Sequence, residues 1–407
     1  MPTDMNILET EIFDTGLLEF DDAGDGQEWS IAATGDFRIT AAQLKLLQFG
    51  DFPYDVTQEI LQADIVLSNL ELPVIGNDEL VRKVKEIIPK KLHSTLISIP
   101  PEVLVEAQKM GINFFNIANN HIKDFGAVGV VETINHLDNY AIPWSGAGLN
   151  RAEAATFSTL DVGGFNIALG GYAQNEAIAA GNDEPGANII EPQRMIREVT
   201  ALKSDSEIDF VIVSIHDGYE YSSVPRLEMF TLCRQLIDAG ADLIIGNHPH
   251  VPHGFELYNG KPIFYSLGNF YYDVPKEHSG AFAEWTRKSF VPKLTFRGNK
   301  LAKMEIIPIV MDDALFINRA KGEDRQKILE LLNYRSNLLN KTDIDLENSD
   351  FVKTHVFDVI MKAIYDAGTR NDTEFLDYFL SKQLKKDPAL KCFKDISRLL
   401  SKKTSQL

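Results

Sequence analysis

Six side chains with the chemistry of metal ligands stand at the ends of apolar stretches along the chain. Three are histidines, two are carboxylates and one is an amide: Asp36, Glu71, Asn120, His216, His248 and His250. Imidazole, carboxylate and amide groups, without a thiolate, suit divalent ions such as Mn, Fe, Co or Zn, and several oxygens beside imidazole favour two ions. The sequence therefore predicts a centre of two divalent metal ions.

A pair of such ions has a defined chemistry. Two ions about 3.5–4 Å apart bind a shared hydroxide as the nucleophile and hold the oxygens of the group under attack. His121 directly follows Asn120, so a histidine lies over the substrate if the asparagine carbonyl reaches a metal, and it is then placed to protonate the leaving group. We expect a metal-dependent hydrolase acting on a phosphoester, phosphoanhydride or amide centre, with His121 as the general acid.

Each of these residues also has a structural interpretation when it is taken alone. Asp36 is of a type that favours helix N-caps, and Asn120 ends an asparagine pair typical of turns. A lone histidine or carboxylate after a strand is more often a loop residue than a ligand. We expect that plain role for His253, close to the histidine pair. The joint placement of six such residues at strand ends favours the metal centre.

Alternating strands and helices are expected to position these residues. From Trp29 onward, apolar β-branched runs are followed by small or polar clusters and then by segments with helical periodicity, which is typical of an α/β fold. The strand candidates are residues 29–36, 63–71, 114–121, 165–172, 209–218, 242–250 and 261–270. Their nearly continuous apolar character indicates burial on both faces. Ligands of open α/β folds bind outside the carboxyl ends of the strands, where the six residues fall.

Helical segments separate the strands and follow them. The candidates between strands are residues 100–111, 126–141, 191–204 and 225–240, several of which end in glycine, as helices often do. Residues 291–298 and 303–311 are expected to form a closing hairpin, and charged helices follow at 323–340 and 350–368. We interpret those helices as a solvated face packed on the core, with oligomerisation through them as the alternative.

This pattern divides the chain into three segments. We expect an acidic N-terminal segment at residues 1–28, the main domain at 29–311 and a helical C-terminal extension at 312–407. A chain of 407 residues that is 44% hydrophobic is long and apolar enough for a large buried core.

The charge balance limits the partners. Lys and Arg total 40 against 59 Asp and Glu, a formal net charge of −19, so we expect no nucleic-acid partner and no attraction to an anionic membrane. An anion that binds here needs local positive charge, and bound metal ions supply it. We therefore expect a small-molecule or peptide-like substrate.

Cysteine content and hydropathy indicate the compartment. Cys233 and Cys392 are far apart and fit neither a disulfide framework nor a thiolate zinc site, so both are expected to be small core residues. The first thirty residues lack a basic start and a signal-length apolar run, and no stretch approaches a membrane span. A cytoplasmic protein without a membrane anchor is the simplest interpretation.

An ordered set of short motifs resembles a known family. The motifs are GD at 35–36, NLE at 69–71, ANNHIKDFG at 118–126, GAGLNRAEAA at 146–155, HDGYEY at 216–221, GNHPHV at 246–251 and YSLGNF at 265–270. Together they resemble the CapA, or poly-γ-glutamate capsule-synthesis, family, a branch of the calcineurin-like metallophosphoesterases. The resemblance covers roughly residues 30–310. It implies a four-layer αββα sandwich with a dinuclear metal centre at the strand ends.

The resemblance also implies roles for individual residues. It assigns one ion to Asp36 and His250, the other mainly to Asn120, His216 and His248, and the bridge between them to Glu71. His121 takes the place of the catalytic histidine. Glu220 belongs to the H-x-G-x-E pattern of the family and is expected to act in catalysis.

Polar positions near the cleft are matched as well. Asn69 and Asn269 correspond to such positions, and we expect them, with Arg38, to bind the substrate.

Four positions depart from the implied pattern. Arg38 stands where the broader phosphoesterase pattern has the histidine of Asp-x-His, Glu71 where those enzymes have an aspartate, and Asn247 in place of a commoner histidine. Asp217 stands where the family usually has a tryptophan, and it is expected to enlarge or acidify the pocket. The missing imidazole at position 38 is expected to weaken the first metal site, and Asp217 bears on which substrate is bound.

Two other functions stay open at this point. The first is a component of poly-γ-glutamate or capsule biosynthesis that acts on γ-glutamyl amides, which the family name implies. The second is a degenerate, non-catalytic binding protein that keeps the fold, and the missing Asp-x-His imidazole motivates it.

Overall fold

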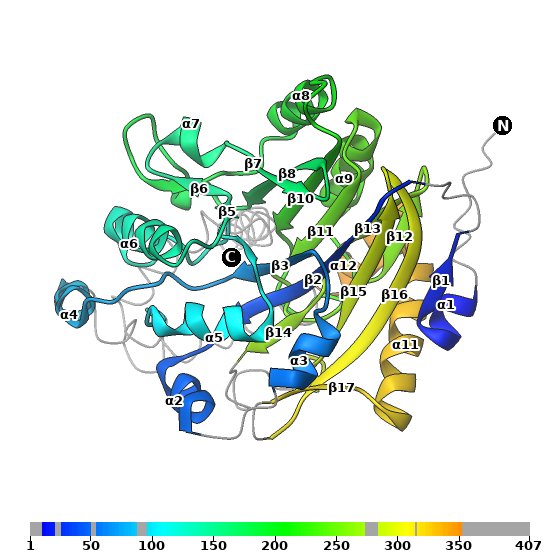
Figure 1. Cartoon of the computed structure of the whole chain (residues 1–407), viewed down its shortest axis with the longest axis horizontal. Helices are drawn as coiled ribbons and strands as arrows, with labels where there is room; N and C mark the ends of the chain where they lie inside the picture. Colours follow the sequence, from blue (N-terminus) through cyan, green and yellow to red (C-terminus); the bar gives the residue numbers. More distant parts are fainter. Residues whose placement is uncertain are drawn as a thin grey trace, which may run out of the picture.

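The computed structural model describes residues 10–20, 26–49, 54–87, 96–272, 284–313 and 316–351. Within them, two β-sheets lie face to face and helices cover their outer faces (Figure 1). The fold is a four-layer αββα sandwich, which confirms the predicted fold class.

The larger sheet has nine strands within the described residues. Its hydrogen-bonded order is β1 (Leu17–Glu19), β16 (Lys300–Met311), β15 (Lys288–Arg297), β2 (Glu28–Arg38), β3 (Ile65–Leu70), β4 (Phe114–Asn116) and β5 (Trp144–Ser145), with β14 (Asn269–Tyr272) beside β2 and β17 (Ile317–Arg319) beside β16. Strands β2, β3, β4, β5 and β14 run parallel, whereas β15 pairs antiparallel with both β2 and β16. The β15–β16 pair is the closing hairpin predicted near residues 291–311.

The smaller sheet has six strands in the part of the chain that the structure describes. Their order is β12 (Phe255–Tyr258), β13 (Lys261–Phe264), β11 (Leu243–Asn247), β10 (Phe210–His216), β8 (Phe165–Ala173) and β7 (Ser158–Val162). The four central strands are parallel, and the two edge strands pair antiparallel with their neighbours. A short ribbon of β6 (Ala147–Gly148) and β9 (Gly186–Ala187) lies apart from both sheets.

Helices form the outer layers, and shorter ones lie at the edges of the sandwich. Near the larger sheet the helices are α2 (Ala41–Phe49), α3 (Tyr54–Ile60), α4 (Asp78–Ile87), α5 (Glu102–Met110) and α6 (Gly126–Asn139). Near the smaller sheet they are α8 (Pro192–Lys203) and α9 (Leu227–Ala239). The remaining ones are α1 (Thr10–Thr15), α7 (Arg151–Ala154), the 3₁₀ turn η3 (Glu176–Ile178), α11 (Gly322–Asn337) and α12 (Lys341–Phe351). None of the helices in the described ranges is both long and apolar enough to cross a membrane.

Period-two alternation along the central strands builds three apolar layers. In β10, Phe210 and Ile212 face the space between the sheets, whereas Val211 and Val213 pack against α8 and α9. In β2, Ile31 points between the sheets in the same way. Successive strand side chains point to opposite faces, so a strand with helices on one side and a sheet on the other is apolar throughout. This arrangement explains the continuous apolar runs in the sequence.

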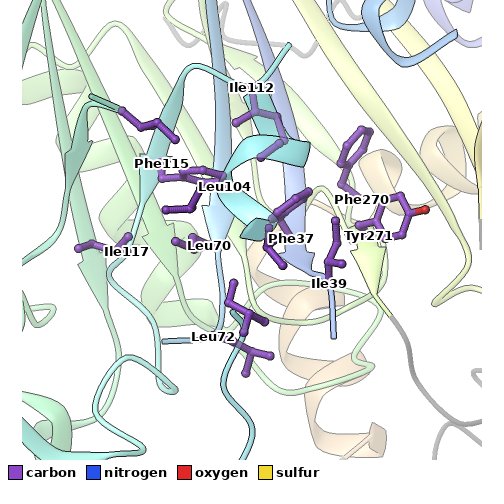
Figure 2. Packing of buried hydrophobic residues seen from close by; sticks show 14 of the residues in the cluster. Phe37, Ile39, Leu70, Leu72, Leu104, Ile112, Phe115, Ile117, Phe270 and Tyr271 are labelled. Atoms are coloured by element: carbon purple, nitrogen blue, oxygen red, sulfur yellow. The ribbon is translucent and has the colours of Figure 1, made fainter. Parts of the chain in front are cut away.

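The layer between the larger sheet and its helices lies beside the strand ends (Figure 2). Phe37 of β2, Leu70 of β3, Phe115 of β4 and Phe270 of β14 gather there with Leu104 of α5. Each is buried at 1% exposure or less, which contributes about 1.5–3 kcal/mol per side chain. The polar residues next to them in sequence are therefore carried on rigid strands.

Both terminal segments join the sandwich where they are described. Strand β1 pairs with β16, and Ile328, Leu329 and Leu332 of α11 lie in the core between the sheets. The division at residues 28 and 311 stays a prediction. Most of the predicted helix at 350–368 and Cys392 lie outside the described residues, while Cys233 is buried in α9 as expected.

Several strands are shorter than predicted. The candidate at 114–121 is a strand only over Phe114–Asn116, and the candidate at 261–270 is two strands, β13 and β14, separated by a turn. The asparagine, glycine and histidine residues that follow β4, β11 and β13 lie beyond the hydrogen-bonded part of these strands. These loops carry the polar groups of the site.

Candidate metal centre

The ends of four parallel strands meet between the two sheets. Asp36 lies in β2 and Glu71 directly follows β3, whereas His216 ends β10 and His248 follows β11. The backbone N–H of His248 donates to Oδ2 of Asp36 over 3.2 Å, which joins the smaller sheet to the larger one. Residues separated by more than two hundred positions are thereby brought into contact.

Asp36, Glu71 and His250 form one group of ligand atoms, here called the first cluster. Their candidate atoms all lie within 4.8 Å of one another. Nδ1 of His250 is 3.2 Å from Oδ2 of Asp36, and Nε2 of the same ring is 3.4 Å from Oε1 of Glu71. All three side chains are buried.

Glu71 shows that a cation fits the first cluster. Its two carboxylate oxygens are buried, and neither accepts a hydrogen bond from any described residue. Burial raises the pKa of Glu71 to about 7, with His250 opposing the rise. A buried carboxylate without donors is costly unless a charge compensates it. In the metal-free protein His250 is that charge, because burial is outweighed by Glu71 and Asp36, which raise the pKa of His250 to about 10. A divalent ion would replace this proton.

Asn120, His216 and His248 form the second cluster. Oδ1 of Asn120 lies 2.8 Å from Nε2 of His216, and Nδ1 of His248 lies 3.0 Å from the same nitrogen. Ligand atoms bound to one ion at about 2.0–2.1 Å lie about 3.3 Å apart. Both distances are therefore close to those between ligands of one ion.

The histidines of the second cluster are held neutral. Burial, reinforced by the neighbouring histidines, holds the pKa of His216 well below its usual value. Burial likewise lowers the pKa of His248 to about 3. A neutral imidazole has the lone pair that a metal requires. The donor set of the second cluster therefore also fits a divalent ion.

Two asparagines hold the ligands in place. Nδ2 of Asn69 donates to Oδ1 of Asp36 over 2.7 Å and lies 3.1 Å from Nδ1 of His216. Oδ1 of Asn269 is 3.0 Å from Nδ1 of His250, which leaves Nε2 of that ring as the nitrogen facing Glu71. Both amides are almost fully buried, so they orient ligands, and their predicted contact with substrate stays a prediction.

His121 is paired with a carboxylate beside the second cluster. Its Nδ1 lies 2.8 Å from Oδ2 of Asp124, and its side chain is 24% exposed. Burial lowers the pKa of His121, but the hydrogen bond and charge of Asp124 outweigh that effect, and the net pKa is raised. The backbone N–H of His121 donates to Oδ1 of Asn119 over 3.0 Å. This arrangement can hold a proton and deliver it.

Arg38 brings a positive charge close to the first cluster. Its Nη1 donates to the Tyr272 hydroxyl over 2.9 Å, and its guanidinium lies 4.7 Å from the centre of that ring. The Tyr272 oxygen is in turn 3.3 Å from Nε2 of His250. Through the Tyr272 hydroxyl, the guanidinium of Arg38 is therefore linked to His250 of the first cluster.

The H-x-G-x-E segment lies on the rim. Glu220 is exposed, and its charge adds to those of Glu71 and Asp36, which together outweigh burial and raise the pKa of His250. The ring of Tyr221 lies 6.0 Å from that of His250. Asp217 is buried and pairs with Arg226 through both carboxylate oxygens, so Arg226 balances the charge that we expected to acidify the pocket.

Other residues at the site escaped the sequence analysis. Nε2 of Gln174 lies 3.0 Å from Nε2 of His248, and Nδ2 of Asn116 donates to Oδ1 of Asn69 over 2.8 Å. Tyr272 and Asp124 complete this set. Gln174 directly follows β8, so the strand-end rule that selected the ligands also points to it. His253 is buried with Nε2 3.0 Å from the Ser222 carbonyl, in agreement with its expected loop role.

These features define a class: a four-layer αββα protein with two groups of metal-competent side chains between its sheets. Residues 30–274 match the family described as bacterial capsule synthesis protein PGA_cap, and the chain belongs to this family. The resemblance inferred from the motifs is confirmed. The match includes every residue of both clusters and ends before α11 and α12.

Individual relatives agree with the family match. The chain is 30% identical over 262 residues to the capsule biosynthesis protein CapA of Bacillus anthracis, across 62% of this chain and 60% of that protein. It is 30% identical over 316 residues to the PGA biosynthesis protein CapA of Bacillus subtilis (strain 168), across 75% of this chain and 78% of that protein. The first of these matches spans less than two thirds of the relative.

Solved structures are similar at a lower level. A 5'-nucleotidase precursor from Thermus thermophilus aligns with a TM-score of 0.38 and 12% identity, covering 76% of this chain and 59% of that chain.

Proposed function

We propose that this capsule-synthesis family member is a metal-dependent hydrolase. The observation that carries the proposal is the buried Glu71 carboxylate, which faces His250 without a hydrogen-bond donor next to three further converging ligand atoms. A pair of ions held in this way activates water, which favours a hydrolase over a non-catalytic binding protein. Asp36, Glu71 and His250 would hold one divalent ion, and Asn120, His216 and His248 the other.

The chemistry of such ions is the activation of water and the polarisation of the group under attack. The chain's own residues supply the rest. Because Asp124 holds Nδ1 of His121, Nε2 is the nitrogen available to the substrate. As the bond between the attacked atom and the leaving group breaks, Nε2–H gives its proton to the departing oxygen or nitrogen.

Arg38 defines the kind of substrate. In a chain with a net charge of −19, a guanidinium held over Tyr272 is a local attraction for one anionic group. We propose a small-molecule or peptide-like substrate that carries a phosphate or a carboxylate next to the scissile bond. Glu220 and Tyr221 on the rim would contact the part of the substrate outside the clusters.

Metal counting and hydrolysis assays test the proposal. Wild-type protein loaded with Mn²⁺ or Zn²⁺ is expected to bind two ions and to cleave a chromogenic phosphoester or γ-glutamyl anilide. His248→Ala is expected to lose an ion and activity, whereas His121→Asn is expected to lose activity and keep both ions. A wild-type protein that binds no divalent ion and shows no metal-dependent hydrolysis would refute the proposal.

A second candidate function has its own support. The two relatives at 30% identity are described as proteins of capsule and PGA biosynthesis. We propose on this ground that the scissile bond is a γ-glutamyl amide. Deletion of the gene is expected to change the amount or length of a γ-glutamyl polymer, and an unchanged polymer together with phosphoester cleavage would favour the phosphoester alternative.

A further inference from the structure

We propose that the C-terminal helices α11 and α12 position His248 and His250 for metal binding, with Arg335 as the main positioning residue. This inference rests on the proposed metal site. The two helices lie outside residues 30–274, the part of the chain that matches the family. The ligands and the elements that support them therefore come from different parts of the chain.

The histidine loop needs support because its backbone is strained. His248 and His250 adopt φ values of 102° and 60°, and Tyr221 in the neighbouring loop has a φ of 69°. Residues with a Cβ seldom occupy this region and keep it only when the surrounding structure holds them there. The Tyr221 N–H donates to the Pro249 carbonyl over 2.7 Å, so the two strained loops are tied together.

Helix α11 supports the histidine loop directly. The Arg335 side chain is buried and donates from Nη1 to the Pro252 carbonyl, two residues after His250. The next residue in the helix, Ser336, accepts a hydrogen bond from the Phe255 N–H over 3.0 Å. Both contacts hold the backbone between the histidine pair and β12.

The approach of the helix is close enough to require a glycine. A Cβ added at Gly254 would lie 2.5 Å from the Ser336 nitrogen and 2.6 Å from the Arg335 carbonyl group. These atoms belong to the backbone and cannot rotate away. The end of α11 and the loop after His250 are therefore packed as one rigid unit.

Helix α12 supports the second strained loop. Oγ of Ser223 donates to Oε2 of Glu347 over 2.8 Å, and Nδ2 of Asn348 donates to the Pro225 carbonyl over 2.9 Å. The ring of Phe351 stacks on Tyr219 at 6.4 Å. The loop that follows His216 is thus held by α12, as the loop that contains His248 and His250 is held by α11.

The identity of Arg335 argues for a role beyond packing. Burial lowers its pKa to about 10, and a guanidinium stays charged at neutral pH even so. Burying a charge is costly unless it is partnered, so a helix that only needed to pack would carry an apolar residue here. The hydrogen bond to Pro252 is the specific interaction that an apolar residue does not provide.

The test compares two arginines of the same helix. Arg335→Met removes the bond to Pro252, whereas Arg325→Met removes bonds to the Asp14 and Thr15 carbonyls, away from both loops. Calorimetry measures Mn²⁺ and Zn²⁺ affinity, and visible absorption of the Co²⁺-loaded protein reports ligand geometry. We expect Arg335→Met to lose about 10-fold or more in affinity, as residues that orient metal ligands do, and to change the Co²⁺ spectrum.

The control variants distinguish a failure of this inference from a failure of the proposed function. Arg325→Met should bind metal like wild type, and Arg335→Lys, which keeps a donor, should recover part of the loss. If wild type binds metal and Arg335→Met binds it equally well with the same Co²⁺ spectrum, this inference is wrong. If wild type binds no metal, the proposed function fails instead. Should Arg335→Met fail to fold by circular dichroism, Ser336→Ala, which removes the neighbouring bond from α11 to the Phe255 N–H, replaces it, with a weaker affinity supporting the inference and an unchanged one overturning it.

Discussion

At the scale of single residues, the two clusters differ in the charge of their side chains. Glu71 and Asp36 supply carboxylates in the first cluster, whereas burial keeps His216 and His248 neutral in the second. His121 differs from both because the charge of Asp124 raises its pKa. The same residue type is thus suited to act as a ligand in one place and, in the proposed function, as a proton donor in another.

Glu71→Gln tests the first cluster. The amide keeps the size of the side chain but removes the charge that a divalent ion requires, so we expect the bound metal to fall from two ions per chain towards one. Elemental analysis after dialysis measures this. Glu228→Gln, on the exposed side of α9, is the matched control, and equal stoichiometry in the two variants would argue against Glu71 as a ligand.

Asp124→Asn tests the proton donor. A general acid works only while it is protonated, so activity falls as pH rises through its pKa. Loss of the Asp124 charge lowers the pKa of His121, and the alkaline limb of kcat/KM should move to lower pH. His121→Asn should lose about 10²–10⁴-fold in kcat. An alkaline limb that stays in place in Asp124→Asn would mean that another group donates the proton.

At the scale of elements, the motif glycines place the strand ends. A Cβ at Gly35 would lie 1.8 Å from the Gly268 carbonyl oxygen, and one at Gly246 would lie 2.1 Å from the Tyr265 carbonyl oxygen. Only glycine lets β2 and β11 approach these neighbouring segments. The GD and GNHPH motifs therefore combine a close backbone contact with the ligand that follows it.

Gly246→Ala tests this close approach. The added methyl group meets backbone atoms and forces a shift, so we expect the free energy of unfolding to fall by about 1–3 kcal/mol and metal binding to weaken. Urea denaturation and calorimetry measure the two effects. Gly181→Ala is the control, because its Cβ would lie no closer than 3.1 Å, against the Glu184 side chain. A stable Gly246→Ala protein would contradict the account.

At the scale of the whole molecule, a large acidic protein carries a small set of buried neutral histidines. Burial and the charge of Arg335 hold the pKa of His253 to about 3, well below the value near 6.5 expected in the unfolded chain. Between those two pH values the unfolded chain binds the proton and the folded protein does not. Stability is therefore complete above about pH 6.5 and declines as the pH falls towards 3.

His253→Gln tests this pH dependence. In the metal-free protein, each histidine of this kind lowers the free energy of unfolding by up to about 1.4 kcal/mol for each pH unit between the unfolded and the folded pKa. In the variant the free energy of unfolding should fall less steeply as the pH decreases, because about one proton fewer is taken up on unfolding. Its stability at pH 7.5 is expected to be lower because the Ser222 contact is lost. Urea denaturation at pH 5 and pH 7.5 measures the slope, and a slope equal to that of wild type would exclude His253 as the source.

Local patterns in the sequence were sufficient for the α/β class and for the six ligand candidates, whereas the four-layer sandwich was implied by the resemblance to the capsule-synthesis family. Strand and helix periods, and the polar residues that end the strands, are short-range signals. The motif order pointed to the family, and the structure brings all six side chains together. Strand ends near Asn116 and Phe264 were placed too late, because the apolar character of the following turns resembles that of a strand.

The resemblance already grouped Asp36 with His250, and Asn120 with His216 and His248, but only the tertiary structure decided which contacts join and support the two groups. The contact of Asp36 with His248 joins residues of different sheets. The sequence does not predict this contact, because a period-two pattern indicates which face of a strand is buried but not which strand of the other sheet lies opposite. The same holds for Asn69 as a support of Asp36, for Arg226 as the partner of Asp217, and for Arg335 against Pro252. The sequence by itself determined the types of the candidate ligands and the strands that carry them. The packing of the two sheets and the C-terminal helices determined the geometry of the site. Such long-range contacts depend on how complete layers fit together.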